Sequence, residues 1–282
     1  MQIAVASGKG GTGKTTIATS LALSLAGIAK VRYFDCDVEA PNGHLFLKPT
    51  FSESTPAIIR IPQIQTETCV ACGRCVEVCQ FHALAKVGKN ILVFPQLCHG
   101  CGSCTWNCPE TAIVEVSNPI GTLERGLAPE NIEFFRGQLT ISEPMPTPVI
   151  RQLKKMGHPL PNTTDIFDAP PGASCSVVET LRGVDFALLV TEPTPFGLHD
   201  LKQMVGILRD MNIPAGVVIN RDEIGDNGVE TYCSAEKLPI LLRIPFDRQI
   251  AEGVSKGKTL VDNFPNYSSS FQQLISRIQE VC

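Results

Sequence analysis

Short apolar runs alternate along much of the chain with longer stretches in which apolar and polar residues mix at helical spacing. The apolar runs are typical of buried strands, and they lie at residues 3–6, 30–35, 164–168, 184–191, 215–221 and 239–245. Helices are expected between them, at residues 15–29, 197–211, 228–236 and 246–256. Because alternating strands and helices build parallel sheets covered on both faces, the pattern predicts an α/β fold with a doubly wound, mostly parallel sheet.

The pattern is weaker from residue 49 to residue 135. Residues 49–59 and 119–135 are expected to be connectors, and a short strand is expected at 139–141. Residues 268–282 form an amphipathic pattern whose polar face carries Arg277 and Glu280. Helices that bind membrane surfaces are rich in Lys and Arg on that face, so this helix is expected to dock on the protein itself.

Composition narrows the functional classes. The chain has 282 residues, which favours about two domains, and 43% of them are hydrophobic. A net charge of −4 argues against nucleic-acid binding, and no apolar run reaches the ~20 residues of a membrane span. The first residues lack the features of a signal peptide, so a cytoplasmic location is expected. There the 12 cysteines are not expected to form disulfides, and most of them are expected to bind metal.

A glycine-rich segment follows the first predicted strand. It runs from Gly8 to Thr15 and fits the pattern G-x-x-x-x-G-K-[ST]. Its glycines let backbone N–H groups point at phosphate oxygens, and the following helix adds its positive N-terminal end. Lys14 is expected to reach the β- and γ-phosphates and Thr15 to bind Mg²⁺. A glycine turn without a ligand is the alternative, but the strand–loop–helix context favours a phosphate loop.

Acidic residues end two of the predicted strands. Asp35 and Asp37 follow the run at 30–35, and Asp168 ends the run at 164–168 just before Pro-Pro-Gly. Carboxylate oxygens suit a hard ion such as Mg²⁺, and one carboxylate can orient an attacking water. Asp also caps turns after strands, which is the simpler interpretation of each residue taken alone.

Two cysteine runs share one spacing, C-x₂-C-x₂-C-x₃-C, which is that of bacterial ferredoxins. Their first cysteines stand 29 residues apart, at Cys69 and Cys98. Zinc also accepts four thiolates, but zinc sites usually use two separated C-x₂-C pairs. The spacing therefore favours iron–sulfur clusters over zinc.

In ferredoxins that carry two such runs, the fourth cysteine of each run serves the other cluster. The resemblance implies one [4Fe-4S] cluster on Cys69, Cys72, Cys75 and Cys108, and a second on Cys79, Cys98, Cys101 and Cys104. Gln80 stands where a proline usually follows the first run.

The stretch KGGTGKT resembles the deviant Walker A motif of the MinD/ParA/Mrp and nitrogenase-iron-protein superfamily. That resemblance implies an ATPase in which Lys9 crosses a homodimer interface to the partner's nucleotide. It also implies that Asp37 belongs to switch I, that Asp168 and Gly172 belong to switch II, and that Asn220 and the loop at Pro245 contact adenine. The catalytic residues that the resemblance implies are Lys9, Lys14, Asp37 and Asp168. The residues expected to bind Mg²⁺ are Thr15, Asp35, Asp37 and Asp168. ATP or ADP is assigned to Gly8, Lys9, Gly10, Gly11, Thr12, Gly13, Lys14, Thr15, Thr16, Asn220, Arg221 and Pro245.

Both sets of motifs together resemble MinD-superfamily ATPases that carry an inserted ferredoxin-like α+β domain. The expected division is an ATPase domain at 1–59 and 119–282, interrupted by the insert at 60–118.

Four cysteines lie outside the runs: Cys36, Cys175, Cys233 and Cys282. Free cysteines are usually small buried hydrophobes. Cys175 follows Asp168 by seven residues, an offset that nitrogenase iron protein uses for a cluster ligand. A bridging cluster or metal on Cys175 at a dimer interface is the alternative to a packed thiol.

Three functions fit these motifs. The first is an ATP-gated redox protein, in which an ATP-dependent homodimer controls electron transfer from two [4Fe-4S] clusters to a partner protein. The second is a maturation factor of the Mrp type for iron–sulfur or other metal cofactors. The third is a MinD/ParA-like positioning ATPase with a redox-sensing insert. No nucleic-acid or membrane partner is expected for any of them.

Overall fold

The computed structural model describes residues 1–281, so that Cys282 lies outside the described residues. Its strands are β1 (Gln2–Ala6), β2 (Lys30–Asp35), β3 (Thr50–Ile64), β4 (Leu84–Val87), β5 (Asn90–Val93), β6 (Ile113–Ala128), β7 (Ile132–Leu139), β8 (Thr163–Asp168), β9 (Phe186–Thr191), β10 (Ala215–Asp222) and β11 (Ile240–Pro245). Its α-helices are α1 (Lys14–Ala26), α2 (Gly43–Leu47), α3 (Arg74–Glu77), α4 (Ser103–Trp106), α5 (Thr147–Met156), α6 (Cys175–Leu181), α7 (Pro195–Asp210), α8 (Gly228–Ala235), α9 (Arg248–Ser255), α10 (Leu260–Asn263) and α11 (Tyr267–Val281).

One large sheet organises the described chain, with strand order β11-β10-β9-β1-β8-β2-β7-β6-β3. The strands from β11 to β7 pair in parallel, whereas β6 and β3 add antiparallel strands at one edge. The prediction of an α/β fold with a mostly parallel sheet is therefore confirmed.

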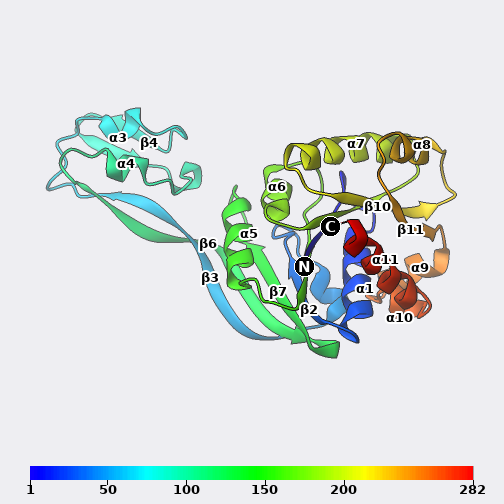
Figure 1. Ribbon diagram of the computed structural model, residues 1–282. Coiled ribbons are helices and arrows are strands. Elements are labelled where there is room, and N and C mark those ends of the chain that lie inside the picture. The colour runs from blue at the N-terminus through cyan, green and yellow to red at the C-terminus, as the bar shows by residue number, and fades with distance from the viewer. Residues whose placement is uncertain (282) are drawn as a thin grey trace.

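Helices cover both faces of this sheet (Figure 1). Residues of β1 alternate between two cores, with Ala4 and Ala6 in one and Ile3 and Val5 in the other. The first core is closed by α5, α6, α7 and α8. The second is closed by α1, α10 and α11. This arrangement brings the carboxyl ends of the central parallel strands to one edge, where ligands bind in such folds.

The strands β3 and β6 form a long antiparallel ribbon. Their register runs from Thr50, paired with Leu127, to Ile64, paired with Ile113. Figure 1 shows the ribbon leaving the main body and carrying residues 65–112 at its far end; we call these residues the cysteine lobe.

The lobe has a small core of its own and an internal repeat. Cys75, Leu84, Ile91, Cys104 and Ile113 pack together between the hairpin β4–β5 and the helices α3 and α4. Positive φ angles recur at a spacing of 29 residues: Ala71 matches Gly100, Gly73 matches Gly102, and His82 matches Thr111. The two cysteine runs therefore share a backbone conformation as well as a spacing.

Some sequence expectations for the middle of the chain were wrong. Residues 49–59 and 119–135 are mostly strand, in β3, β6 and β7, and they belong to the main sheet rather than acting as connectors. No separate strand spans 139–141, because β7 already ends at Leu139. The reason is that the ribbon is largely exposed, so it lacks the apolar run of a buried strand.

The terminal amphipathic segment is helical over its described residues, as α11, and it packs against α1. Phe271, Leu274 and Ile278 on this helix are buried in the second core. Among residues 1–281, no helix is long and apolar enough to cross a membrane.

Candidate nucleotide site and cysteine lobe

The segment between β1 and α1 forms a loop at the carboxyl edge of the sheet. Its conformation requires glycine at two positions, because Gly11 and Gly13 have φ angles of 79° and 94°. A Cβ atom on Gly13 would also stand 2.4 Å from Nδ2 of Asn220. Gly13 immediately precedes the first turn of α1, so the loop delivers the helix N-terminus to the site.

Two residues from the end of β10 hold this loop. Asn220 Nδ2 donates a hydrogen bond to the carbonyl oxygen of Thr12 at 2.8 Å, and Arg221 Nη2 donates to that of Gly11 at 3.3 Å. Both were predicted to contact the nucleotide. The structure brings them to the loop backbone.

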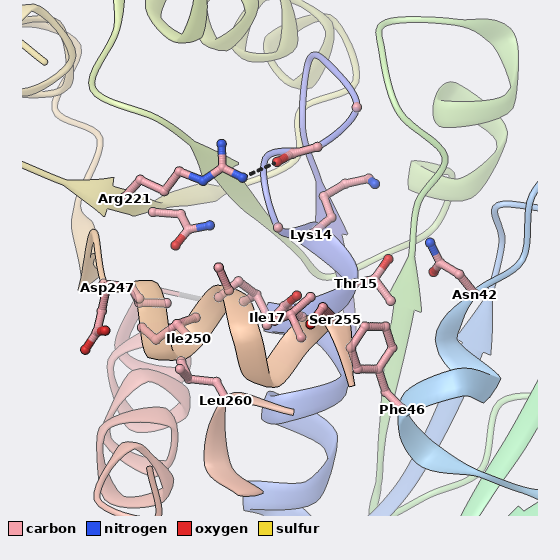
Figure 2. A pocket seen from close by; sticks show the side chains of 18 of the residues that line it. Lys14, Thr15, Ile17, Asn42, Phe46, Arg221, Asp247, Ile250, Ser255 and Leu260 are labelled. Carbon is pink, nitrogen blue, oxygen red and sulfur yellow. Dashed lines mark hydrogen bonds between the residues drawn. The ribbon is translucent and has the colours of Figure 1, made fainter. Parts of the chain in front are cut away.

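A cavity of about 450 Å³ opens beside the loop (Figure 2). Figure 2 shows Lys14 and Thr15 on its loop side, Asn42 and Phe46 on the side of α2, and Ile250 and Ser255 on α9. Of the predicted site residues, the structure gathers around this cavity Gly10, Gly11, Gly13, Lys14, Thr15, Thr16, Asp37, Asn220, Arg221 and Pro245. It does not bring Gly8, Lys9 or Thr12 there; these line a smaller cavity against α7.

Asp35 and Asp168 lie behind the loop as a buried carboxylate pair. They are register partners on the neighbouring strands β2 and β8, and both are fully buried. Asp35 accepts a hydrogen bond from the Gly43 amide at 2.8 Å, and Asp168 accepts one from the Tyr33 hydroxyl at 2.9 Å. The other oxygen of each carboxylate, Oδ1, has no hydrogen-bond partner among residues 1–281.

Burial dominates the electrostatics of these acids. It raises the pKa of Asp35 well above its ordinary value, and the neighbouring Asp168 raises it further. Burial also raises the pKa of Asp168 and of Asp37, while the Lys14 ammonium opposes the rise in both. Buried carboxylates with free oxygens suit a hard divalent cation, so this donor set fits the predicted Mg²⁺.

Sequence reasoning missed several residues that line the site. Asn42 and Phe46 come from α2 and its N-cap, and Asp247 precedes α9. The Oδ1 atom of Asn42 is buried without a hydrogen-bond partner, as is the Oγ1 atom of Thr12. No motif marked Asn42 or Phe46, because the segment after Asp37 has only the composition of a turn.

The cysteines of the lobe gather around two small cavities. Cys69, Cys72, Cys75 and Cys108 line one, and Cys79, Cys98, Cys101 and Cys104 line the other. These are the two sets of four expected from the resemblance to ferredoxins. What they bind stays a prediction.

Backbone amides donate hydrogen bonds to two cysteine sulfurs in this lobe. The amide of Ala83 donates to Sγ of Cys79, and the amide of Ala112 donates to Sγ of Cys108, each at 3.3 Å. Within the described chain, no group of three or more His, Cys, Asp or Glu residues could hold a metal ion.

The remaining described cysteines separate into two kinds. Cys36 and Cys233 are buried, whereas Cys175 is exposed at the start of α6. Burial raises the pKa of the Cys36 thiol strongly, and it raises the pKa of Cys233 to about 11. The packed-thiol interpretation is therefore right for Cys36 and Cys233 and wrong for Cys175.

Comparisons with known proteins agree with this geometry. A family model described as the CobQ/CobB/MinD/ParA nucleotide binding domain matches residues 3–261. The chain is 30% identical to an uncharacterised protein of Methanocaldococcus jannaschii over 99% of this chain and 97% of that one. It is 24% identical to an iron–sulfur cluster carrier protein of Pyrococcus horikoshii over 99% of this chain and 87% of that protein.

Among solved structures, the septum site-determining protein MinD of Pyrococcus horikoshii, complexed with Mg-ADP, has a similar fold. The TM-score is 0.59 at 18% identity, covering 98% of this chain and 95% of that one.

Proposed function

This chain belongs to the CobQ/CobB/MinD/ParA nucleotide-binding family, and we propose that nucleotide binding at its site controls electron transfer from the cysteine lobe. The chain is a P-loop ATPase of the MinD/ParA type. In our proposal it couples ATP-dependent homodimerisation to electron transfer through two [4Fe-4S] clusters to a partner protein. The lobe carries the redox function, and the nucleotide controls when it is available.

The observation that carries this proposal is a short backbone path from the nucleotide site to the lobe. Asp37 lines the nucleotide cavity, and the next residue, Val38, accepts a hydrogen bond through its carbonyl oxygen from the Leu139 amide at 2.8 Å. Leu139 on β7 pairs with Gly121 on β6, which is one strand of the ribbon. A switch that moves with the γ-phosphate would therefore displace a strand that leads to the lobe.

The chain's own residues supply the nucleotide chemistry. Lys14 is buried beside the loop and would balance phosphate charge, while Thr15, Asp35, Asp37 and Asp168 would hold Mg²⁺ directly or through its waters. The Tyr33 hydroxyl donates to one oxygen of Asp168, and the other oxygen, which has no hydrogen-bond partner among the described residues, would be available to the cation. Lys9 would reach the nucleotide of the second copy.

The eight cysteines of the two runs would hold the clusters in the two sets described above. When bound, [4Fe-4S] clusters supply one-electron transfer. The amides of Ala83 and Ala112 donate to one ligand sulfur in each set, and such hydrogen bonds tune reduction potential.

The test measures how fast the anaerobically reduced protein loses electrons to a one-electron acceptor protein, with and without MgATP. MgATP should change this rate in the wild type. A Lys14→Ala variant, which keeps every cysteine, should lose the response while keeping about eight irons per chain. Equal rates with and without MgATP in the wild type would refute nucleotide gating, and zinc in place of iron would refute the redox role.

A second candidate is a maturation factor, favoured by the similarity to a protein named an iron–sulfur cluster carrier. In that case iron and sulfide should move from this protein to an apo-acceptor, and its own absorbance should fall in step. Because all four ligands of each set come from the lobe, we expect the iron to stay in place during nucleotide turnover. Retained iron in that assay excludes the carrier role.

A further inference from the structure

One buried acid beside the phosphate loop has no role in the proposal above. Glu192 follows β9, the strand that pairs with β1, so it stands beside the phosphate loop. Only 7% of its side chain is exposed. Its backbone is fixed as well, because its carbonyl oxygen accepts a hydrogen bond from the Thr194 amide at 2.8 Å.

The Glu192 carboxylate binds two cations, one on each oxygen. Oε2 is 3.1 Å from Nζ of Lys9, and Oε1 accepts a hydrogen bond from Nη1 of Arg221 at 2.6 Å. Arg221 also donates to the Gly11 carbonyl through its other nitrogen, Nη2. Glu192 therefore connects the phosphate loop to the end of β10.

The two cations are not equivalent. Lys9 makes the longer contact, has a flexible stem and lies in the loop itself, whereas Arg221 is held at both ends of a rigid planar group. Removing the only partner of a buried carboxylate is costly. With Arg221 in place, Lys9 can leave Glu192 without leaving that charge unpaired.

We infer that Glu192 is a positioning residue that holds Lys9 against its own subunit in the nucleotide-free chain and releases it when a nucleoside triphosphate enters. Arg221 stays behind as the counter-charge. The three negative phosphates compete for the Lys9 ammonium and outweigh a single, already neutralised carboxylate. The destination of the released lysine, the nucleotide of a second copy, rests on the proposed function; the hold itself does not.

The contact by which Glu192 holds Lys9 is tested by brief acylation of nucleotide-free protein. The labelling of each lysine is measured by mass spectrometry. Lys30, which pairs with Glu133 at 3.2 Å, serves as the internal reference because global unfolding would raise its labelling too. In Glu192→Gln, the ratio of Lys9 to Lys30 labelling should rise roughly two- to fivefold, the range expected for losing one partly exposed ion pair. An unchanged ratio overturns the inference.

Two variants serve as controls. Glu179→Gln removes an equally buried carboxylate that pairs with Arg151 away from the nucleotide cavity, and it should leave the ratio unchanged. Glu192→Asp keeps the charge and should restore part of the protection of Lys9. If the Gln and Asp variants raised the ratio equally, packing rather than charge would be responsible, and the inference would be wrong.

The release is tested by titrating a non-hydrolysable ATP analogue with Mg²⁺ and following dimer formation by sedimentation. Glu192→Gln should lower the analogue concentration at half-dimerisation by a similar factor, because Lys9 no longer has to leave a carboxylate. An equal or higher concentration contradicts the release. If the wild type stayed monomeric throughout, the proposed dimerisation would fail, whereas the acylation result would still decide whether Glu192 holds Lys9.

Discussion

Asp165 and Asp168 stand three residues apart on β8, yet their carboxylates have opposite energetic roles. Asp165 accepts two hydrogen bonds from Arg32, at 2.7 and 2.6 Å, and both residues are buried. Asp168 instead faces Asp35, another buried acid, and keeps one oxygen without a partner. The charge of Asp165 is neutralised by Arg32 within the fold, whereas Asp168 keeps an oxygen that a bound cation would use.

We predict that Asp168→Asn stabilises the nucleotide-free protein by about 0.5–2 kcal/mol while it abolishes Mg²⁺-dependent nucleotide binding. The reason is that burial raises the pKa of Asp168, so at neutral pH folding works against the ionised carboxylate that the unfolded chain carries. An asparagine oxygen can still accept from Tyr33. The free energy of unfolding in urea measures the effect, and for the wild type it should increase as the pH falls toward the raised pKa values.

Asp165→Asn is the matched contrast to this substitution. It leaves the buried Arg32 guanidinium without its anion, so it should destabilise the fold by about 3–5 kcal/mol. If both variants shifted unfolding in the same direction, the distinction between a neutralised and an unneutralised carboxylate would be wrong.

The free thiols give a second prediction at this scale. Cys175 is exposed, whereas Cys36 and Cys233 are buried with raised thiol pKa values. Because the thiolate is the reactive form, iodoacetamide at about pH 8 should alkylate Cys175 in native protein well before Cys36 or Cys233. Peptide mapping measures the order, and unfolded protein, in which all three should react at similar rates, is the control. Early alkylation of Cys36 would contradict the close packing of the residue that follows β2.

At the scale of elements, Gln152 on α5 fixes the base of the ribbon. Its Oε1 accepts from the Ile58 amide at 3.1 Å, and its Nε2 donates to the Ile58 carbonyl at 2.9 Å. Ile58 lies on β3, the edge strand of the sheet, near an irregularity in the pairing with β6. One side chain therefore satisfies backbone groups that no further strand pairs.

Gln152→Leu should lower the free energy of unfolding by about 1–3 kcal/mol, because it leaves the Ile58 amide and carbonyl unsatisfied. Amide hydrogen exchange at Ile58 should become faster, while the relative exchange rates of the amides in the central strands stay the same. Gln203→Leu, which alters an exposed glutamine bonded to His199, should change stability by less than about 0.5 kcal/mol. Unchanged exchange at Ile58 would mean that the ribbon does not depend on this contact.

Sequence patterns identified buried elements well and exposed ones poorly. The predicted strand at 30–35 is β2, because all but its first residue are buried and apolar periodicity reports burial. The ribbon escaped detection because β3 carries Pro56 and Pro62 with many polar residues, a composition that argues against a central strand. Those prolines are tolerated because β3 lies at the edge of the sheet.

The residues of the site also fall into two groups, those that a local sequence motif reveals and those that depend on the strand order. A local motif reveals Gly13, Lys14 and Thr15, because one loop and one helix position them together. Glu192 also follows an apolar strand and could have been noted on that ground, as Asp35 and Asp168 were. Its pairing with both Lys9 and Arg221 depends on the order of β1, β9 and β10 in the sheet, which no local pattern contains.

At the scale of the whole molecule, β3 and β6 are the strands that enter and leave the cysteine lobe and connect it to the ATPase. The pairing of Ile64 with Ile113 closes the ribbon, and beyond it the lobe has its own small core. In the part of the chain that the structure describes, by contrast, the two main cores contain no residue between Ile61 and Ile120. Two bodies with separate cores are expected to fold with little mutual dependence.

We therefore predict that residues 65–112 can be replaced by Asn-Gly, a two-residue turn that joins antiparallel strands, without loss of the nucleotide site. The shortened protein should bind MgADP within about threefold of the wild type, a difference under about 0.7 kcal/mol, and it should bind no iron. Calorimetry and metal analysis measure both properties. Its ATPase rate should also become independent of any redox partner, because the path from Asp37 through Leu139 would end in a bare ribbon. If instead the shortened chain failed to fold or lost nucleotide binding, the lobe would be part of the ATPase core, and the division of the chain that underlies nucleotide gating would be wrong.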